Sequence, residues 1–240
     1  MPGKNDVSFG RGADPDKYTS HYFDDELLQK FEIHSYRNAA GILATSFPAQ
    51  FDSLLEALRK FEISETMIRV PGGSKGPIAK YVDTLFSDNW RELRISADLH
   101  VKLLDAKKRS KTVREYTKVG YLDGHRIDFV SDKVALDLEW NSKDQTYDRD
   151  LYAFSAFYDA GAIDLGIILT RGSSLDTNYF RSLGKVLKKD GFTEGKDDVY
   201  KKFGASTTWM GKLLYRLDAG RNGGCPVLAI GIRPECIRKT

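Results

Sequence analysis

Acidic residues alternate with apolar residues along two neighbouring segments in the middle of this 240-residue chain. The stretch from Arg126 to Asn141 reads RIDFVSDKVALDLEWN, in which Asp128 lies between two apolar residues and Asp137 and Glu139 alternate with leucines. Because side chains alternate between the faces of a strand, this period predicts a hairpin with acids on one face. Clustered carboxylates are costly unless a cation lies between them, and oxygen ligands of this kind suit Mg²⁺.

The register of this predicted hairpin decides whether its acids can share an ion. If Ser131 and Asp132 form a tight two-residue turn, Asp128 lies opposite Ala135, and Glu139 follows about 13 Å further along its strand. A shared ion therefore requires a longer loop, a bend or a β-bulge, and bulges do occur beside active sites. The alternative is a solvated hairpin face that carries ordinary surface acids.

The first third of the chain is predicted to be helical. Pro48 suits the first turn of a helix, and apolar residues follow at helical spacing from Phe51 to Phe61. A weaker helix is expected over Ile78–Phe86. Residues 1–20 are polar and contain several glycines and prolines, so we expect a flexible N-terminal arm followed by a single domain over residues 21–240.

The middle of the chain is predicted to be an antiparallel meander. Apolar and polar residues alternate from Ile95 to Leu103, the period of a half-buried strand. Ile127 and Phe129 are expected on one face of the hairpin, opposite Asp128. The remaining strands of the meander are expected over Val113–Tyr121, Arg126–Val130 and Val134–Glu139.

The pattern then changes to alternating helices and strands. A helix carries Tyr147, Leu151, Phe154 and Tyr158 on one face, and the apolar run at residues 163–170 predicts a strand buried on both faces. About twenty residues separate this strand from the previous one, which is enough for a parallel crossover. Two further helices, one with Leu183, Val186 and Leu187 and one with Trp209, Leu213, Leu214 and Leu217, precede a last strand over Pro226–Ile232. The expected fold is α/β, a mixed sheet flanked by helices.

Composition excludes some classes of protein. The chain is 41% hydrophobic and 30% charged, with a formal net charge of +3, which is compatible with nucleic acid binding. No run approaches the roughly 18 apolar residues of a membrane helix, so we expect no membrane partner and a cytoplasmic location. No GxxxxGK[ST] motif occurs, which argues against a nucleotide-driven motor.

Cysteine and histidine offer little chemistry at the level of sequence. Cys225 and Cys236 lack metal-ligand spacing, and we expect two buried thiols rather than the one possible disulfide. The histidines are scattered and suggest neither a zinc site nor a Ser/Cys triad. They are His21, His34, His100 and His125.

The segment IDFVSDKVALDLEWNSKDQTYDRDL resembles the core of the PD-(D/E)xK nucleases, and specifically the BglII-type type II restriction endonucleases. Residues 166–172 and 206–208 are also similar, and the likeness extends patchily from Phe47 to the C-terminus. The resemblance implies a restriction-endonuclease-like fold. It also implies Mg²⁺-dependent hydrolysis of phosphodiester bonds in a short palindromic site of double-stranded DNA.

The resemblance further implies roles for individual residues. Asp128 and Glu139 would bind Mg²⁺ together with the backbone carbonyl of Trp140. Asn141 stands at the third motif position, where the superfamily usually has Lys. A neutral amide can neither act as a base nor supply positive charge, so its expected task is to orient the attacking water. Lys143 is an alternative source of positive charge.

Two weaker catalytic candidates come from the same resemblance. Lys75 falls near a position that a catalytic-site Asn occupies in BglII. Glu56, on the helix that begins near Pro48, would buttress the site, and the alternative is an ordinary surface glutamate.

DNA contacts are expected from basic and polar loops. A run of cations between two strands would contact phosphates, or else form a charged hairpin tip that protects a sheet edge. This run comprises Lys107, Lys108, Arg109, Lys111 and Arg114. Candidates for reading base edges are Lys143 and Asp144, Arg171, Ser173 and Ser174, and Ser206, Thr207 and Thr208. Ser206 or Thr207 would alternatively cap the helix that bears Trp209.

A homodimer is the expected assembly, because a palindromic site has the two-fold symmetry of such a dimer. A separate cognate methyltransferase would accompany a restriction enzyme. Two alternatives remain at this stage: a repair or structure-specific nuclease with the same core, and a non-catalytic DNA-binding module whose carboxylates are surface acids.

Overall fold

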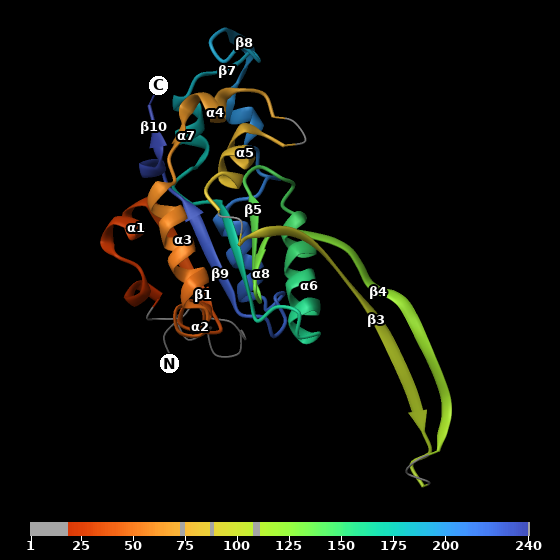
Figure 1. Ribbon diagram of the computed structural model, residues 1–240. Helices are drawn as coiled ribbons and strands as arrows, with labels where there is room; N and C mark the ends of the chain where they lie inside the picture. The colour runs from red at the N-terminus through yellow and green to blue at the C-terminus, as the bar shows by residue number, and fades with distance from the viewer. Residues whose placement is uncertain (1–18, 73–74, 87–88, 108–110, 240) are drawn as a thin grey trace, which may run out of the picture.

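A mixed six-stranded sheet in the order β1-β9-β6-β5-β4-β3 organises the computed structural model of the chain (Figure 1). The structure describes residues 19–72, 75–86, 89–107 and 111–239. Most of the predicted N-terminal arm, residues 1–18, lies outside the described residues, whereas Thr19 and Ser20 begin a 3₁₀ helix over Thr19–Tyr22. The mixed sheet with flanking helices confirms the expected fold class.

The central strands β5, β6 and β9 run parallel, and antiparallel strands flank them on both sides. The strands of this sheet are β1 (Phe31–Tyr36), β3 (Arg91–Leu104), β4 (Thr112–Ser131), β5 (Val134–Glu139), β6 (Leu165–Arg171) and β9 (Val227–Ile232). Two small two-stranded sheets join β2 (Ile63–Ser64) to β10 (Ile237–Arg238) and β7 (Lys185–Leu187) to β8 (Glu194–Asp198). The parallel pairing of β5 with β6 confirms the predicted crossover.

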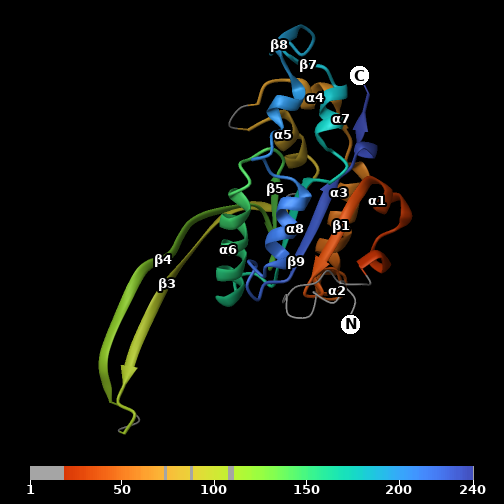
Figure 2. The same cartoon turned by 180° about the vertical axis from the view of Figure 1, so that it is seen from behind.

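Helices cover both faces of the sheet (Figures 1 and 2). Those of the N-terminal half are α1 (Asp25–Lys30), α2 (Ala39–Ser46), α3 (Pro48–Lys60), α4 (Glu65–Arg69) and α5 (Pro77–Asp83). Those of the C-terminal half are α6 (Thr146–Asp159), α7 (Thr177–Ser182) and α8 (Met210–Asp218), with short 3₁₀ helices η2 (Val199–Lys202) and η3 (Pro234–Cys236).

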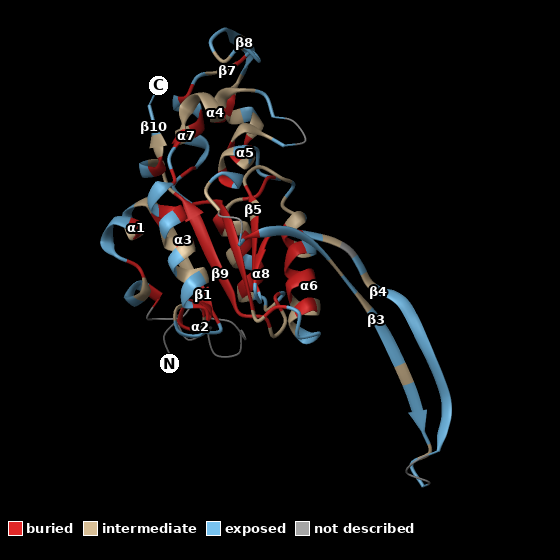
Figure 3. Ribbon diagram, in the orientation of Figure 1, coloured by how far each residue is buried: buried red, intermediate tan, exposed pale blue. Residues whose placement is uncertain are grey.

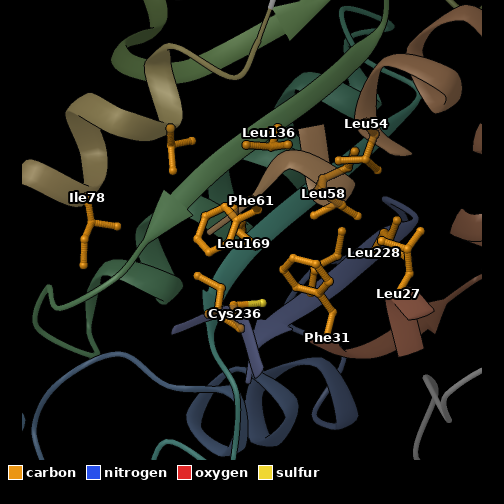
Figure 4. Packing of buried hydrophobic residues seen from close by; sticks show 14 of the residues in the cluster. Leu27, Phe31, Leu54, Leu58, Phe61, Ile78, Leu136, Leu169, Leu228 and Cys236 are labelled. Carbon is orange, nitrogen blue, oxygen red and sulfur yellow. The ribbon is translucent and has the colours of Figure 1, made fainter. Parts of the chain in front are cut away.

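Two apolar cores result, one on each face of the central strands. On one face, Leu54 and Leu58 of α3 pack with Leu136 and Leu228 of the sheet (Figure 4). On the other face α6 and α8 cover the same strands. Their buried residues include Tyr147, Leu151, Phe154, Leu213 and Leu217. Alternate residues of each central strand point to opposite cores, which explains the continuous apolar runs in their sequences.

Strands β3 and β4 extend beyond the body of the molecule as a long two-stranded arm (Figures 1 and 2). We call residues 97–104 and 112–122 the β3–β4 arm; most of them are exposed (Figure 3). The sequence predicted separate strands over Val113–Tyr121 and Arg126–Val130, but the structure shows one continuous strand, β4. Pairing between β3 and β4 shifts register at several points, but it continues along both strands.

Two further expectations about the fold are wrong. The helix expected around Leu183 is instead α7, which ends at Ser182, followed by strand β7. Gly184, with a φ of 71°, takes a left-handed conformation between them and ends the helix. Strand β1 interrupts the first third, which was expected to be helical, because its backbone pairs antiparallel with β9 at the edge of the sheet.

Gly166 of β6 provides a test of the packing between the sheet and α6. A Cβ atom at this position would lie 2.2 Å from Cδ2 of the Phe154 ring, which is fully buried. We expect Gly166→Ala to lower the free energy of unfolding by about 1–3 kcal/mol, measured by urea denaturation. Gly204→Ala is the control, since a Cβ there meets nothing within 4 Å. Equal losses of unfolding free energy in the two variants would contradict the close packing of Gly166 against Phe154.

Candidate functional site

The turn between β4 and β5 sets the register of the acidic hairpin. Phe129 pairs with Leu136, and Ser131 pairs with Val134, so the turn comprises Asp132 and Lys133 rather than residues 131 and 132. Asp132 adopts a left-handed φ of 52° in this turn. The continued register therefore places Asp128 beside Asp137, two residues beyond Ala135.

A bulge in β4 lies at the position of Asp128. On the strand β3, Arg91 pairs with Val130 and Leu93 with Ile127, so one more residue is accommodated in β4 than in β3. The extra residue sends neighbouring apolar side chains to different cores, Ile127 to the α6 face and Phe129 to the α3 face. The expectation that these two residues share a face is thus wrong, and one of the irregularities considered above, a β-bulge, is present.

Asp128 and β5 are joined by reciprocal hydrogen bonds. The backbone N–H of Asp128 donates to Asp137 Oδ1 at 2.9 Å, and the N–H of Leu138 donates to Asp128 Oδ2 at 3.1 Å. Asp128 is exposed as a residue, but protein atoms surround its carboxylate. This burial and the charge of Asp137 raise the pKa of Asp128 to about 6.

Asp137 is a site residue that the sequence interpretation did not select. It is 4% exposed and contacts Asp128 directly, whereas Glu139 lies two residues, or about 7 Å, further along β5. The available signal was its position on the same strand face as Glu139. Without the position of the turn, that signal could not distinguish the two acids.

Asp128 and Glu139 line one pocket of about 480 Å³ at the end of β5. Its walls also include Lys75, Asn141 and Lys202. Glu139 Oε2 is buried, and no described residue gives it a hydrogen bond. Burial and the nearby charge of Asp150 raise the pKa of Glu139 to about 8. Such a carboxylate is ionised readily only if a positive charge approaches it.

Asn141 presents a free acceptor in the wall of this pocket. Its Nδ2 donates to the backbone carbonyl of Lys202 at 3.1 Å, which fixes the orientation of the amide. Its Oδ1 is buried and accepts no hydrogen bond from the described residues. Lys202, which sequence reasoning missed, donates its own Nζ to the carbonyls of Ile68 and Val70, and burial lowers its pKa to about 8.

The two weaker catalytic candidates lie in different environments. Lys75 lines the pocket, and its Nζ lies 2.5 Å from Asp83 Oδ2. Its charge also favours ionisation of Asp128. Glu56 is exposed on α3, pairs with Lys60 and does not line the pocket. The structure thus favours the surface alternative for Glu56.

Arg171 joins the loops around the site and is itself only 3% exposed. Its Nε donates to the carbonyl of Trp140 at 3.0 Å, while Nη2 donates to Thr207 Oγ1 at 2.7 Å and to the carbonyl of Thr208 at 2.5 Å. The guanidinium also lies over the Phe203 ring. The guanidinium is thus engaged within the protein, which weighs against the DNA-reading role expected for Arg171, and that role stays a prediction.

The same contact changes the expectation for Trp140. Its carbonyl was expected to bind the metal ion together with Asp128 and Glu139, but it accepts the hydrogen bond from the Arg171 guanidinium. A positive charge at this oxygen opposes a cation at the same place. This contact weighs against the carbonyl of Trp140 as a metal ligand, although a carbonyl oxygen has a second lone pair, and the role stays a prediction.

The loops predicted to read DNA lie side by side. Lys143 forms an isolated bridge with Thr207, the Asp144 N–H donates to the carbonyl of Ser206, and the Thr208 N–H donates to the carbonyl of Ser142. The residue before α8 is Trp209, and neither Ser206 nor Thr207 caps that helix. The capping alternative is therefore wrong, and Lys143 and Ser206 remain exposed.

The other residues predicted to contact DNA differ in their exposure and in their hydrogen bonds. Ser173 donates both its backbone N–H and its hydroxyl to Glu32, whereas Ser174 is exposed. Lys107 and Lys111 are exposed at the end of the β3–β4 arm. Lys108 and Arg109 lie outside the described residues. Lys111 is 17 residues from Asp128 along β4, which corresponds to about 55 Å of strand.

The family model described as restriction endonuclease BglII/BglIII matches residues 31–232. The chain belongs to this family. It is therefore a nuclease with a restriction-endonuclease-like fold, and its substrate class is double-stranded DNA. A search of curated proteins found no match to this endonuclease.

Cys225 and Cys236 are buried free thiols, as expected. Among the helices that the structure describes, none is long and apolar enough to cross a bilayer.

Replacement of Arg171 tests its role in joining the loops. We expect Arg171→Met to lower the free energy of unfolding of the endonuclease by about 3 kcal/mol, because hydrogen bonds to a charged group are worth roughly 1.5–3 kcal/mol each. The measurement is urea denaturation. Arg181→Met, at an exposed arginine of α7, should change stability by less than about 0.5 kcal/mol. An unchanged free energy of unfolding in Arg171→Met would show that the loops hold together without the guanidinium.

Proposed function

We propose that this endonuclease hydrolyses phosphodiester bonds in a short palindromic site of double-stranded DNA with Mg²⁺ held by Asp128 and Glu139. The observation that carries the proposal is the pocket that both acids line, together with the buried, unpartnered Oε2 of Glu139. A proton or a cation can satisfy such an oxygen, and the family's chemistry favours the cation.

The donor set fits a hard divalent ion. Carboxylate oxygens are the ligands that Mg²⁺ prefers, and this ion completes its shell with waters and substrate phosphate oxygens. Among the described residues, Asp128 Oδ2 accepts a hydrogen bond only from the backbone N–H of Leu138, and Asp128 lines the pocket. When bound, the ion would polarise the scissile phosphate and lower the pKa of the attacking water.

The protein's own residues would orient the reactants. Asn141 Oδ1 is an acceptor whose direction is fixed, so we assign it the task of aligning a water molecule for attack. Lys75 brings positive charge near Asp128 and lines the side of the pocket where a phosphate would lie. Lys202 orders the backbone at Ile68 and Val70 and so acts as a positioning residue.

Recognition of the duplex would use the loops that Arg171 holds in place. Of the candidates, Lys143, Ser174 and Ser206 are exposed and Asp144 is half-buried, whereas Thr207 and Thr208 are buried and Ser173 is bonded to Glu32. We retain Thr207, Thr208 and Ser173 as supports of these loops. The cations of the β3–β4 arm would contact phosphates further along the duplex.

The assembly that suits a palindrome is a two-fold homodimer, with one active site for each strand. A restriction enzyme of this kind would act in the cytoplasm alongside a separate methyltransferase that protects the host site. We further propose that residues 21–240 form a single endonuclease domain, because the six-stranded sheet joins β1 to β9, which lie at the two ends of this range.

Replacement of the two carboxylates tests the catalytic proposal. We expect Asp128→Asn and Glu139→Gln each to reduce the rate of cleavage by about 100-fold or more while retaining specific binding to the duplex. The measurement is digestion of long unmethylated DNA with Mg²⁺, followed by sequencing of the cut ends. The control Glu56→Gln, at an exposed helical acid, should cut at the normal rate.

The same digestion distinguishes the alternatives. Discrete fragments with one palindromic end sequence support a type II enzyme, whereas cutting only at damaged or branched DNA would indicate a repair or structure-specific nuclease. Unchanged activity of Glu139→Gln would indicate that its carboxylate is a bystander. Absence of cutting by the wild-type protein with either Mg²⁺ or Mn²⁺ would contradict the proposal as a whole.

Charge reversal on the β3–β4 arm tests its contact with phosphates. We expect the double variant Lys107→Glu/Lys111→Glu to weaken DNA binding similarly for all sequences and to reduce the slope of log K against log salt by about 0.9 for each lost contact. The measurement is fluorescence anisotropy over a range of salt concentrations. The matched control is Arg59→Glu/Lys60→Glu, on the exposed face of α3 away from the pocket lining. Identical salt slopes for both doubles would exclude the arm from the interface.

A further inference from the structure

A second group of potential metal ligands lies on the face of the sheet that α6 covers. It comprises His125 of β4, Asp137 of β5 and Asp150 of α6, and one ligand atom from each lies within 4.8 Å of the others. Asp137 is 4% exposed and Asp150 is 1% exposed, while the side chain of His125 is 11% exposed. The three residues come from different elements, so only the folded chain brings them together.

Each carboxylate of this group has one oxygen anchored and one oxygen free. Asp137 Oδ1 accepts the backbone N–H of Asp128, and Asp150 Oδ1 accepts Nε and Nη2 of Arg149. Asp137 Oδ2, Asp150 Oδ2 and His125 Nε2 are all buried without a hydrogen-bond partner in the described part of the chain. Anchored outer oxygens with unpartnered inner atoms form the usual arrangement around a bound metal ion.

The three unpartnered atoms do not satisfy one another by direct hydrogen bonds. His125 Nε2 lies 3.8 Å from Asp137 Oδ2, which is too long for a hydrogen bond. This separation is close to the distance of about 3.4 Å between two ligands of a tetrahedral ion whose bonds are roughly 2.1 Å long. Two buried carboxylates and one Arg149 guanidinium also leave a net negative charge, which a divalent cation would reverse.

We propose that His125 Nε2, Asp137 Oδ2 and Asp150 Oδ2 bind a second divalent ion of the Zn²⁺ class, separate from the Mg²⁺ of the proposed active site. An imidazole ligand with two carboxylates suits Zn²⁺ or Co²⁺ better than Mg²⁺, which prefers oxygen ligands and its own waters. His125 and Arg149 also line a surface pocket of about 260 Å³, so an ion would approach the group from this side.

This ion would act through Asp137. The Oδ1 atom of that residue holds the backbone of Asp128 at the bulge, so an ion on Oδ2 would fix the position of both residues. This positioning role rests on the proposed function, whereas the binding site itself does not.

The test measures metal binding without DNA. The whole protein, stripped of metal, is titrated with Co²⁺ and followed by its visible d–d absorption and by calorimetry, with Mg²⁺ present in excess to fill the other site. We expect one Co²⁺ to bind, and we expect His125→Gln and Asp150→Asn each to weaken that binding by at least about 100-fold. His100→Gln, at an exposed histidine of the arm, and Asp128→Asn should bind Co²⁺ like the wild type.

Each outcome bears on the second site and is independent of cleavage. No Co²⁺ binding in the presence of Mg²⁺, or unchanged binding by His125→Gln, would overturn it. Loss of Co²⁺ binding in Asp128→Asn would also overturn it, since the ion would then belong to the active site. X-ray absorption of the Zn²⁺-loaded wild-type protein needs no variant to fold, and it should show one imidazole with oxygen donors and no sulfur; a shell without imidazole would contradict the proposal.

Discussion

The register between β4 and β5 is the constraint on which the rest of the site depends. The turn at Asp132 and Lys133 and the bulge opposite β3 together bring Asp128 beside Asp137. A shift of one residue would send every side chain of the hairpin to the other face and would separate the acids. The same register places Glu139 at the end of β5, where the strand opens into the pocket.

Buried acids around the end of β5 give this region its chemistry. Asp137, Glu139 and Asp150 are each less than one-tenth exposed, and each keeps a carboxylate oxygen that no described residue satisfies. Burial of so much like charge destabilises the folded chain unless protons or cations are bound. The family to which the chain belongs acts on DNA, whose phosphates also need neutralising, so the divalent ion that we propose would neutralise charge on the protein and on its substrate alike.

The contacts around the pocket separate catalytic from supporting roles. Arg171 has the residue type of a DNA-binding side chain, yet its guanidinium is used to join the backbone at Trp140 to the loop at Thr207. That loop in turn pairs with Lys143, which remains exposed. The β3–β4 arm differs from both, since it extends far beyond the body of the molecule (Figures 1 and 2) and carries the exposed Lys107 and Lys111 at its end.

The sequence by itself determined the apolar strands β5, β6 and β9, the helices α3, α5, α6 and α8, the period-two acids and the family, because these depend on local periodicity and on a contiguous motif. Only the tertiary structure decided which acid meets Asp128, because the position of the turn and the extra residue opposite β3 depend on pairing between separate strands. It also decided that Arg171 is buried and that His125 meets Asp150, since each of these contacts joins side chains that are distant in sequence. Periodicity reports the face on which a residue lies, but not which residues lie across from it.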